Sequence, residues 1–241
     1  MLNHIRGLNN IIDPNLMAIV MPLSWAAAVS PTALSVFLII MSMTDNPKLS
    51  GFSFYLGAVF VLLFTVLIGF LMGNALQNTG HADPATIASI DIFLGAILVL
   101  LGLRSAFSKG NKRNSSLFEY LKIDKKASKF AQFRRYFTVG LLTFLINFST
   151  AIFVLAAGRQ IGIAKAGLWA DIGAVAVLTI ITLIVVEVPL FFFLVFPKTA
   201  QRVTQPLNHW LFKHTNLVMA AFLLFIGGLV IYNGLSRIGV T

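Results

Sequence analysis

The chain of 241 residues contains no cysteine, and only 11% of its residues are charged. Without cysteine the protein can form no disulfide, no thiolate metal site and no iron–sulfur cluster. Charged residues make up about 25% of an average soluble domain, so this chain has about half the usual share. Acidic residues are especially few, with eight aspartates and glutamates against 18 lysines and arginines. The chain therefore lacks the polar surface that a water-soluble domain of this length needs.

Apolar residues dominate instead, at 58% of the chain with a mean hydropathy of +0.88. A helix needs about 20 apolar residues to cross the hydrocarbon of a membrane. Six windows of the sequence meet this requirement, at residues 17–43, 51–72, 86–107, 136–157, 168–196 and 217–235. We therefore predict an all-α integral membrane protein with six transmembrane helices.

The basic residues are distributed unevenly among the loops. Ten of the 18 lie in residues 104–135. The loops after the first and fifth spans add Lys48, Lys198, Arg202 and Lys213, and the other side of the membrane receives only Arg6, Arg159, Lys165 and Arg237. Because basic loops stay in the cytoplasm, we predict a multi-pass protein of the cytoplasmic membrane with both termini outside. Residues 108–135 then form a basic cytoplasmic linker near anionic headgroups.

The two halves of the chain resemble each other. Residues 32–36 match 150–154, residues 57–61 match 173–177, and residues 95–103 match 227–235, in the same order. Each unit holds three spans, an odd number, so the second copy (136–241) must be inverted relative to the first (1–107). Inverted repeats are a common plan of secondary transporters. A duplication that is kept only for folding would produce the same sequence repeat. Close helix packing is the expected role of the glycines, which are Gly57, Gly95, Gly102, Gly173, Gly227, Gly228 and Gly234.

A proline interrupts the first span at Ser30-Pro31-Thr32. Proline removes one helical hydrogen bond and its ring crowds the carbonyl of Ala27. In hydrocarbon that freed carbonyl must find a partner, and such breaks are tolerated where they line a protein cavity. We therefore predict a break in the first span, with Pro31 acting as a hinge.

The repeat-related position in the fourth span is the polar cluster 147–150, which contains Asn147, Ser149 and Thr150. Two breakable polar segments related by inversion are the best indication of a transport site in a sequence. We predict that the two breaks meet across a pseudo-two-fold axis. A packing kink, with hydroxyls bonded to their own helix, is the alternative. The predicted substrate-binding residues are Ser30, Pro31, Thr32, Asn147, Ser149, Thr150, Glu187 and Asp171.

Three acidic residues fall within or near the predicted spans. Glu187 is the deepest, and a carboxylate in lipid costs several kcal/mol unless it is neutralised or paired. It is predicted to bind substrate or couple protons, or else to lie near the cytoplasmic headgroups, and its neighbour Pro189 is a second predicted hinge. Asp171 and Asp91 lie near outer ends of spans, where each either functions or reaches the interface.

Chemistry of other kinds has little support. The four histidines are scattered through loops, and no nucleophile–base pair or Gly-rich phosphate loop is present. We therefore predict no catalytic residues, no metal site, no cofactor and no nucleic-acid partner. The protein is not expected to be an enzyme.

The motifs resemble a known family of transporters. Ser30-Pro31-Thr32, the loop with Asn46-Pro47, and Gly57 resemble the LysE superfamily of six-helix exporters. The second half is similar to the GAP family, which contains the glycopeptidolipid- and sulfolipid-addressing proteins. This similarity rests on Pro189, the segment 197–200, Leu207, Trp210-Leu211, His214 and the glycines from Gly227 to Gly234.

The resemblance implies a transporter or flippase-like factor for an amphiphilic envelope lipid or a lipid-linked precursor. Export of a small amino-acid-like or ionic solute is one alternative. A non-transporting assembly partner of a lipid export machine is another. The expected partners are membrane lipid, the lipid or solute substrate, and either a second copy of the chain or a lipid-export protein.

Overall fold

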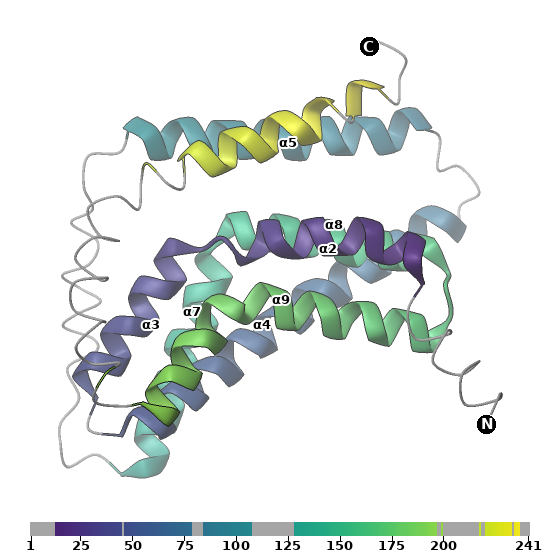
Figure 1. Cartoon of the computed structure of the whole chain (residues 1–241). Helices are drawn as coiled ribbons and strands as arrows, with labels where there is room; N and C mark the ends of the chain where they lie inside the picture. The colour runs from purple at the N-terminus through teal and green to yellow at the C-terminus, as the bar shows by residue number, and fades with distance from the viewer. Residues whose placement is uncertain are drawn as a thin grey trace.

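The computed structural model describes residues 13–44, 46–78, 84–107, 128–196, 199, 217, 220–232 and 234–236. All the regular secondary structure in these residues is helical (Figure 1). The predicted all-α class is therefore confirmed for the described part of the chain. Most of the predicted linker, residues 108–127, lies outside that part, as do both termini.

The first half forms helices that begin at prolines: α2 (Pro14–Ala28), α3 (Pro31–Met43), α4 (Pro47–Asn78) and α5 (Pro84–Phe107). Proline suits the first helical position because the amide hydrogen that it lacks would have no partner there. Asp13 caps α2 by accepting from the amides of Asn15 and Leu16. The chain thus uses proline to start helices in this half.

The second half contains α7 (Lys129–Ile146), α8 (Phe148–Ala164), α9 (Leu168–Val195) and a shorter apolar helix, Ala220–Ser236. α7 begins within the predicted linker, residues 108–135. The turn between α8 and α9 uses positive φ at Lys165 (48°) and Gly167 (103°), and glycine tolerates the second value without strain.

Two of these helices, at Pro47–Ala75 and Leu168–Val195, are long and apolar enough to cross a membrane. Two further pairs qualify together but are bent, α2 with α3 by 54° and α7 with α8 by 77°. Length and composition therefore support two spans among the described residues, or up to four if each bent pair is one span. The predicted third and sixth spans coincide with α5 and with Ala220–Ser236.

Helix α4 packs closely along both α7 and α8. A side chain at Gly57 would collide with the backbone of α7 at Phe137, and one at Gly73 with the backbone of α8 at Arg159. A Cβ atom at Gly140 of α7, or at Gly158 or Gly162 of α8, would likewise collide with the backbone of α4. The contacts with α8 advance together along both helices, Gly69 with Leu155 and Gly73 with Arg159, so α4 runs parallel to α8. Small residues permit such backbone approach where helices associate within a membrane.

Helix α5 pairs in the same manner with Ala220–Ser236, and the two form a layer beside α2 and α8 (Figure 1). A Cβ atom at Gly95 would lie 2.9 Å from the Gly227 carbonyl oxygen, and one at Gly227 would lie 3.0 Å from that of Gly95. Gly234 contacts Ile92, so the pair is antiparallel. Gly228 differs from the prediction, because a Cβ there would meet no atom of the described structure within 4 Å.

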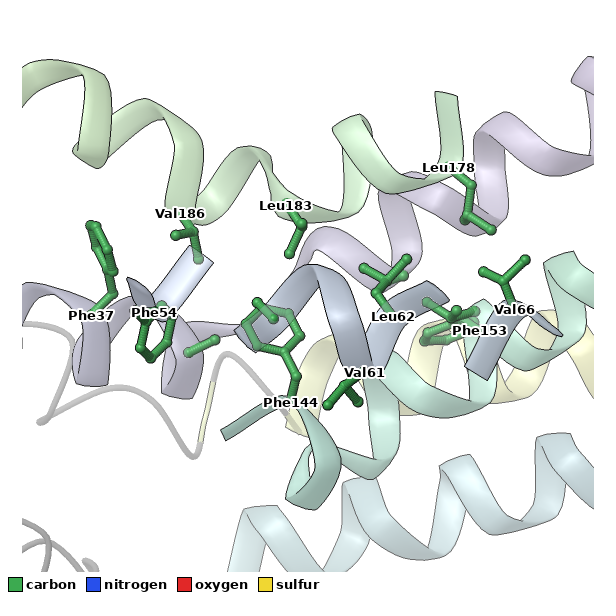
Figure 2. Packing of buried hydrophobic residues seen from close by; sticks show 14 of the residues in the cluster. Phe37, Phe54, Val61, Leu62, Val66, Phe144, Phe153, Leu178, Leu183 and Val186 are labelled. Carbon is green, nitrogen blue, oxygen red and sulfur yellow. The ribbon is translucent and has the colours of Figure 1, made fainter. Parts of the chain in front are cut away.

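Buried apolar side chains of α3, α4, α7, α8 and α9 pack into one core (Figure 2). Phe54 of α4 lies between Phe37 of α3 and Phe144 of α7, with ring centroids 5.4 and 6.4 Å away. Large apolar side chains such as Phe60 and Phe64 are exposed on the other side of α4. An exposed apolar face of this kind suits contact with lipid rather than water.

Candidate functional site

The two helix breaks lie against each other. Ser30 separates α2 from α3, and Asn147 separates α7 from α8. The Asn147 side chain donates a hydrogen bond from Nδ2 to Ser30 Oγ, at 2.6 Å, across 117 residues of sequence. The structure thus brings together the two segments that the sequence analysis singled out.

The carbonyl freed by Pro31 also has a partner from the other half. In a continuous helix, the amide of residue 31 would bond to the carbonyl of Ala27, but proline has no amide hydrogen. Instead, the hydroxyl of Thr150 donates to the Ala27 carbonyl oxygen at 3.0 Å. The Thr150 hydroxyl therefore bonds to the opposite half of the chain and not to its own helix.

Further hydrogen bonds fix the orientation of these groups. Ser149 donates its hydroxyl to Asn147 Oδ1 at 2.8 Å, so the Asn147 amide accepts on one side and donates on the other. Ser30 Oγ also accepts from the backbone amide of Ala33, at 3.2 Å, and so caps α3. Ser30, Ser149 and Thr150 are buried, and Asn147 is half-buried.

Helix α8 begins at this cluster without a side-chain cap. Asn147 occupies the capping position but makes no capping hydrogen bond, because its side chain bonds across to Ser30 and Ser149. The first amides of a helix have no partner within the helix, and the helix dipole adds a partial positive charge there. The break therefore offers backbone donors that suit a polar or anionic oxygen.

Two predicted site residues lie apart from this cluster. The Thr32 side chain is exposed, although its neighbours Ser30 and Pro31 are buried. Asp171 lies in the first turn of α9, half-buried, and its Oδ1 has no hydrogen-bond partner within the described structure. It is 16 residues from Glu187 on the same helix, or about 24 Å at 1.5 Å per residue. Asp171 and Glu187 therefore cannot serve one small site.

Glu187 accepts a hydrogen bond from the hydroxyl of Tyr55 in α4, at 2.9 Å. The carboxylate is half-buried and has a partner that the sequence analysis did not identify. Only the polar tip of Tyr55 within an apolar span could have pointed to it. Of the two predicted hinges, Pro31 lies at a bend, whereas α9 continues as a helix through Pro189.

A buried ion pair joins α8 to α5. Arg159 is part of α8, and its Nη2 lies 2.8 Å from Oδ1 of Asp91 in α5. The two side chains are only 3% and 15% exposed. The prediction that Arg159 belongs to an outer loop is therefore wrong, because α8 continues as far as Ala164. The one feature of the sequence that indicates this pair is the presence of a single basic residue, Arg159, and a single acidic residue, Asp91, next to or within apolar segments.

No group of three or more acidic, histidine or cysteine side chains in the described residues could hold a metal ion. The arrangement is thus a polar junction between two broken helices, and the same packed helices hold two paired acids, Glu187 with Tyr55 and Asp91 with Arg159.

The family described as Sap, sulfolipid-1-addressing protein, matches residues 20–236, which include both helix breaks and both paired acids. The chain belongs to this family. No curated protein and no solved structure matches the chain. Membership in the Sap family associates the protein with the addressing of sulfolipid, a membrane lipid, and so with a lipid-related role.

Proposed function

We propose that this Sap-family protein is a transporter or flippase-like factor that moves an amphiphilic envelope lipid, or a lipid-linked precursor, across the cytoplasmic membrane. The observation that carries the proposal is the bond between Asn147 and Ser30, which joins the breaks of the two halves. Discontinuous helices meeting at a repeat interface are where transporters hold their substrates. We infer that the protein moves the lipid without covalent change.

The helix directions support an inverted repeat of six spans, as in the LysE superfamily. Each half has a bent pair, a long helix and a third helix, in that order. The first elements are antiparallel, because Ser30 meets Asn147 while the earlier Ala27 meets the later Thr150. The third helices, α5 and Ala220–Ser236, are antiparallel as well. An inverted second copy requires both relationships.

In this proposal, the lipid headgroup binds at the junction and its chains lie against apolar helix faces. The uncapped amides of α8 supply donors to the headgroup. The exposed aromatic and aliphatic side chains of α4, such as Phe60, Phe64 and Leu71, supply a surface that acyl chains can contact. Alternation between inward and outward states uses the bends at Ser30-Pro31 and Asn147 as hinges.

One observation favours the second candidate, a non-transporting partner of a lipid export machine. The side chains of Ser30, Asn147 and Ser149 already bond to one another, and Thr150 bonds to the Ala27 carbonyl, as expected of a rigid structural junction. A transporter must break some of these bonds in its cycle, whereas an assembly partner need not. Transport by the purified protein alone separates the two.

The test is lipid movement in proteoliposomes that contain only this chain and a fluorescent phospholipid. We expect the wild type to move the lipid, and Pro31→Ala to fold and insert normally but to move it several-fold more slowly, because one hinge stiffens. Pro22→Ala is the matched control, since Pro22 lies inside α2 without breaking it. If the wild-type protein moves no lipid, or if Pro31→Ala and Pro22→Ala behave alike, the proposal fails.

A further inference from the structure

The guanidinium of Arg159 is buried but mostly unpaired. Its side chain is 3% exposed, and its one ion-pair contact runs from Nη2 to Asp91 Oδ1. The atoms Nε and Nη1 are buried and have no hydrogen-bond partner within the described structure. Burying unpaired polar hydrogens costs free energy, so these donors indicate a place where an acceptor binds.

The geometry of arginine shows which acceptor would fit. A guanidinium has five N–H groups in a planar fork, and each of its two paired-donor edges includes one hydrogen of Nη2. Asp91 takes one hydrogen of Nη2, so the other hydrogen, with Nε or with Nη1, leaves one complete edge open. Such an edge matches two oxygens of a phosphate or carboxylate.

The surroundings of Arg159 indicate how the acceptor arrives. α4 packs so closely against α8 that Gly69 and Gly73 touch the Arg159 backbone, which closes that side. Asp91 is the more exposed partner, at 15%, and belongs to the separate layer of α5 and Ala220–Ser236 (Figure 1). An anion therefore approaches past α5, where it competes with the negative charge of Asp91 for the same guanidinium.

We propose that Arg159 forms a binding site for a phosphate-type oxyanion carried by the headgroup of a membrane lipid, with Asp91 as the competing internal anion. The site is distinct from the junction of Ser30 and Asn147. It goes beyond the proposed function, on which it rests, by adding a second site that selects lipids whose headgroup carries a negative charge.

The test measures binding to the purified full-length chain in a neutral detergent, by native mass spectrometry. The probes are phosphatidylglycerol, a diacylglycerol with the same chains and no phosphate, and inorganic phosphate. We expect phosphatidylglycerol to bind in preference to the other two. If inorganic phosphate binds as tightly as phosphatidylglycerol, the claim that the anion belongs to a lipid is wrong. If diacylglycerol binds as tightly as phosphatidylglycerol, the claim that the site binds an anion is wrong.

Three variants test the role of the guanidinium. Arg159→Gln should weaken phosphatidylglycerol binding by about tenfold or more, the loss expected for charge-assisted hydrogen bonds. Arg159→Lys should also weaken it, because lysine keeps the charge but loses the planar edge. Asp91→Asn should strengthen it, because the competing charge is gone. The last result distinguishes a ligand site from a structural ion pair, for which removing either partner only destabilises the fold.

Arg134→Gln is the matched control, since Arg134 is exposed on α7 and loses the same charge. If Arg159→Gln binds phosphatidylglycerol like Arg134→Gln, the site is refuted. If Arg159→Gln does not fold, the test rests on Arg159→Lys and Asp91→Asn. Phosphatidylglycerol binding that is unchanged in both variants refutes the site. If the protein transports lipid but Arg159→Gln binds phosphatidylglycerol as well as the wild type does, only this inference is wrong. Binding that depends on Arg159 without transport overturns the proposed function alone.

Discussion

The hydroxyl of Thr150 donates to the carbonyl oxygen of Ala27, the acceptor that Pro31 leaves without its helical donor. The two residues lie 123 positions apart, in opposite halves of the chain. One half thus creates the defect and the other half compensates for it. Each half needs the other to complete the junction.

Replacing Thr150 with valine should destabilise the protein, because valine keeps the shape but leaves the Ala27 carbonyl unpaired. Interhelical hydrogen bonds in membranes are worth roughly 0.6 to 2 kcal/mol, and we expect a loss of that size. Pro31→Ala should partly rescue it, since residue 31 can then donate to Ala27 itself. Unfolding in bicelles measures both effects.

The control for that experiment is Thr179→Val. Thr179 donates to Val175 of its own helix, so its loss removes no contact between helices. Equal destabilisation by Thr150→Val and Thr179→Val, or no rescue by Pro31→Ala, would contradict a compensating role for Thr150.

The absence of cysteine makes the junction easy to test by cross-linking. Cysteines at positions 30 and 147 should be joined by a short bifunctional thiol reagent, because the native side chains are within hydrogen-bond distance. The link should stop lipid transport, since the two hinges can no longer separate. Cysteines at 32 and 147 form the control, because the Thr32 side chain is exposed. Transport that continues in the linked protein would show that the junction does not open.

The sequence predicted the junction because its chemistry is local. Proline in an apolar span must leave Ala27 without a donor, and polar residues in the repeat-related segment are the natural compensation. The helical class followed as directly from the long apolar runs. Each break and each apolar run depends on residues close together in the chain, and the repeat relates the two breaks to each other, so no knowledge of packing was needed.

The contacts between distant helices could not be predicted in this way. Arg159 was assigned to a loop because charge alone was counted, whereas its partner Asp91 belongs to a helix 68 positions away. Tyr55 was overlooked because its bond to Glu187 spans 132 positions. Thr32 is predicted as a site residue only because it follows Ser30 and Pro31 in the sequence, but neighbouring residues of a helix face different directions. Such pairings are set by helix rotation and register, which a single sequence does not specify.

The glycine packing of α4 predicts a sharp contrast between two substitutions. A Cβ at Gly73 would collide with the backbone of α8 at Arg159, so Gly73→Ala should separate the helices and destabilise the protein by about 1–3 kcal/mol. Gly228→Ala should be tolerated, because its Cβ meets no described atom within 4 Å. Thermal unfolding in detergent compares them, and equal melting temperatures would contradict the packing.

The predicted orientation can be tested by labelling single cysteines with a membrane-impermeant thiol reagent. A cysteine at position 165, in the exposed turn between α8 and α9, should react from outside the cell. A cysteine at position 112, in the basic linker, should react only after the membrane is opened, because basic loops stay inside. Reaction at 112 in intact cells would overturn the orientation of both termini.

The pairing of Glu187 with Tyr55 leads to a prediction about pH. The sequence predicts that this carboxylate binds substrate or couples transport to protons. Glutamine can still accept the Tyr55 hydrogen bond but cannot titrate, so Glu187→Gln should fold normally and transport lipid at a rate that varies little with pH. Asp171→Asn is the control, because it removes an acid about 24 Å away along the same helix. Initial rates of lipid transport across a pH series measure the difference. A wild-type pH profile that survives in Glu187→Gln but disappears in Asp171→Asn would transfer the coupling role to the start of α9.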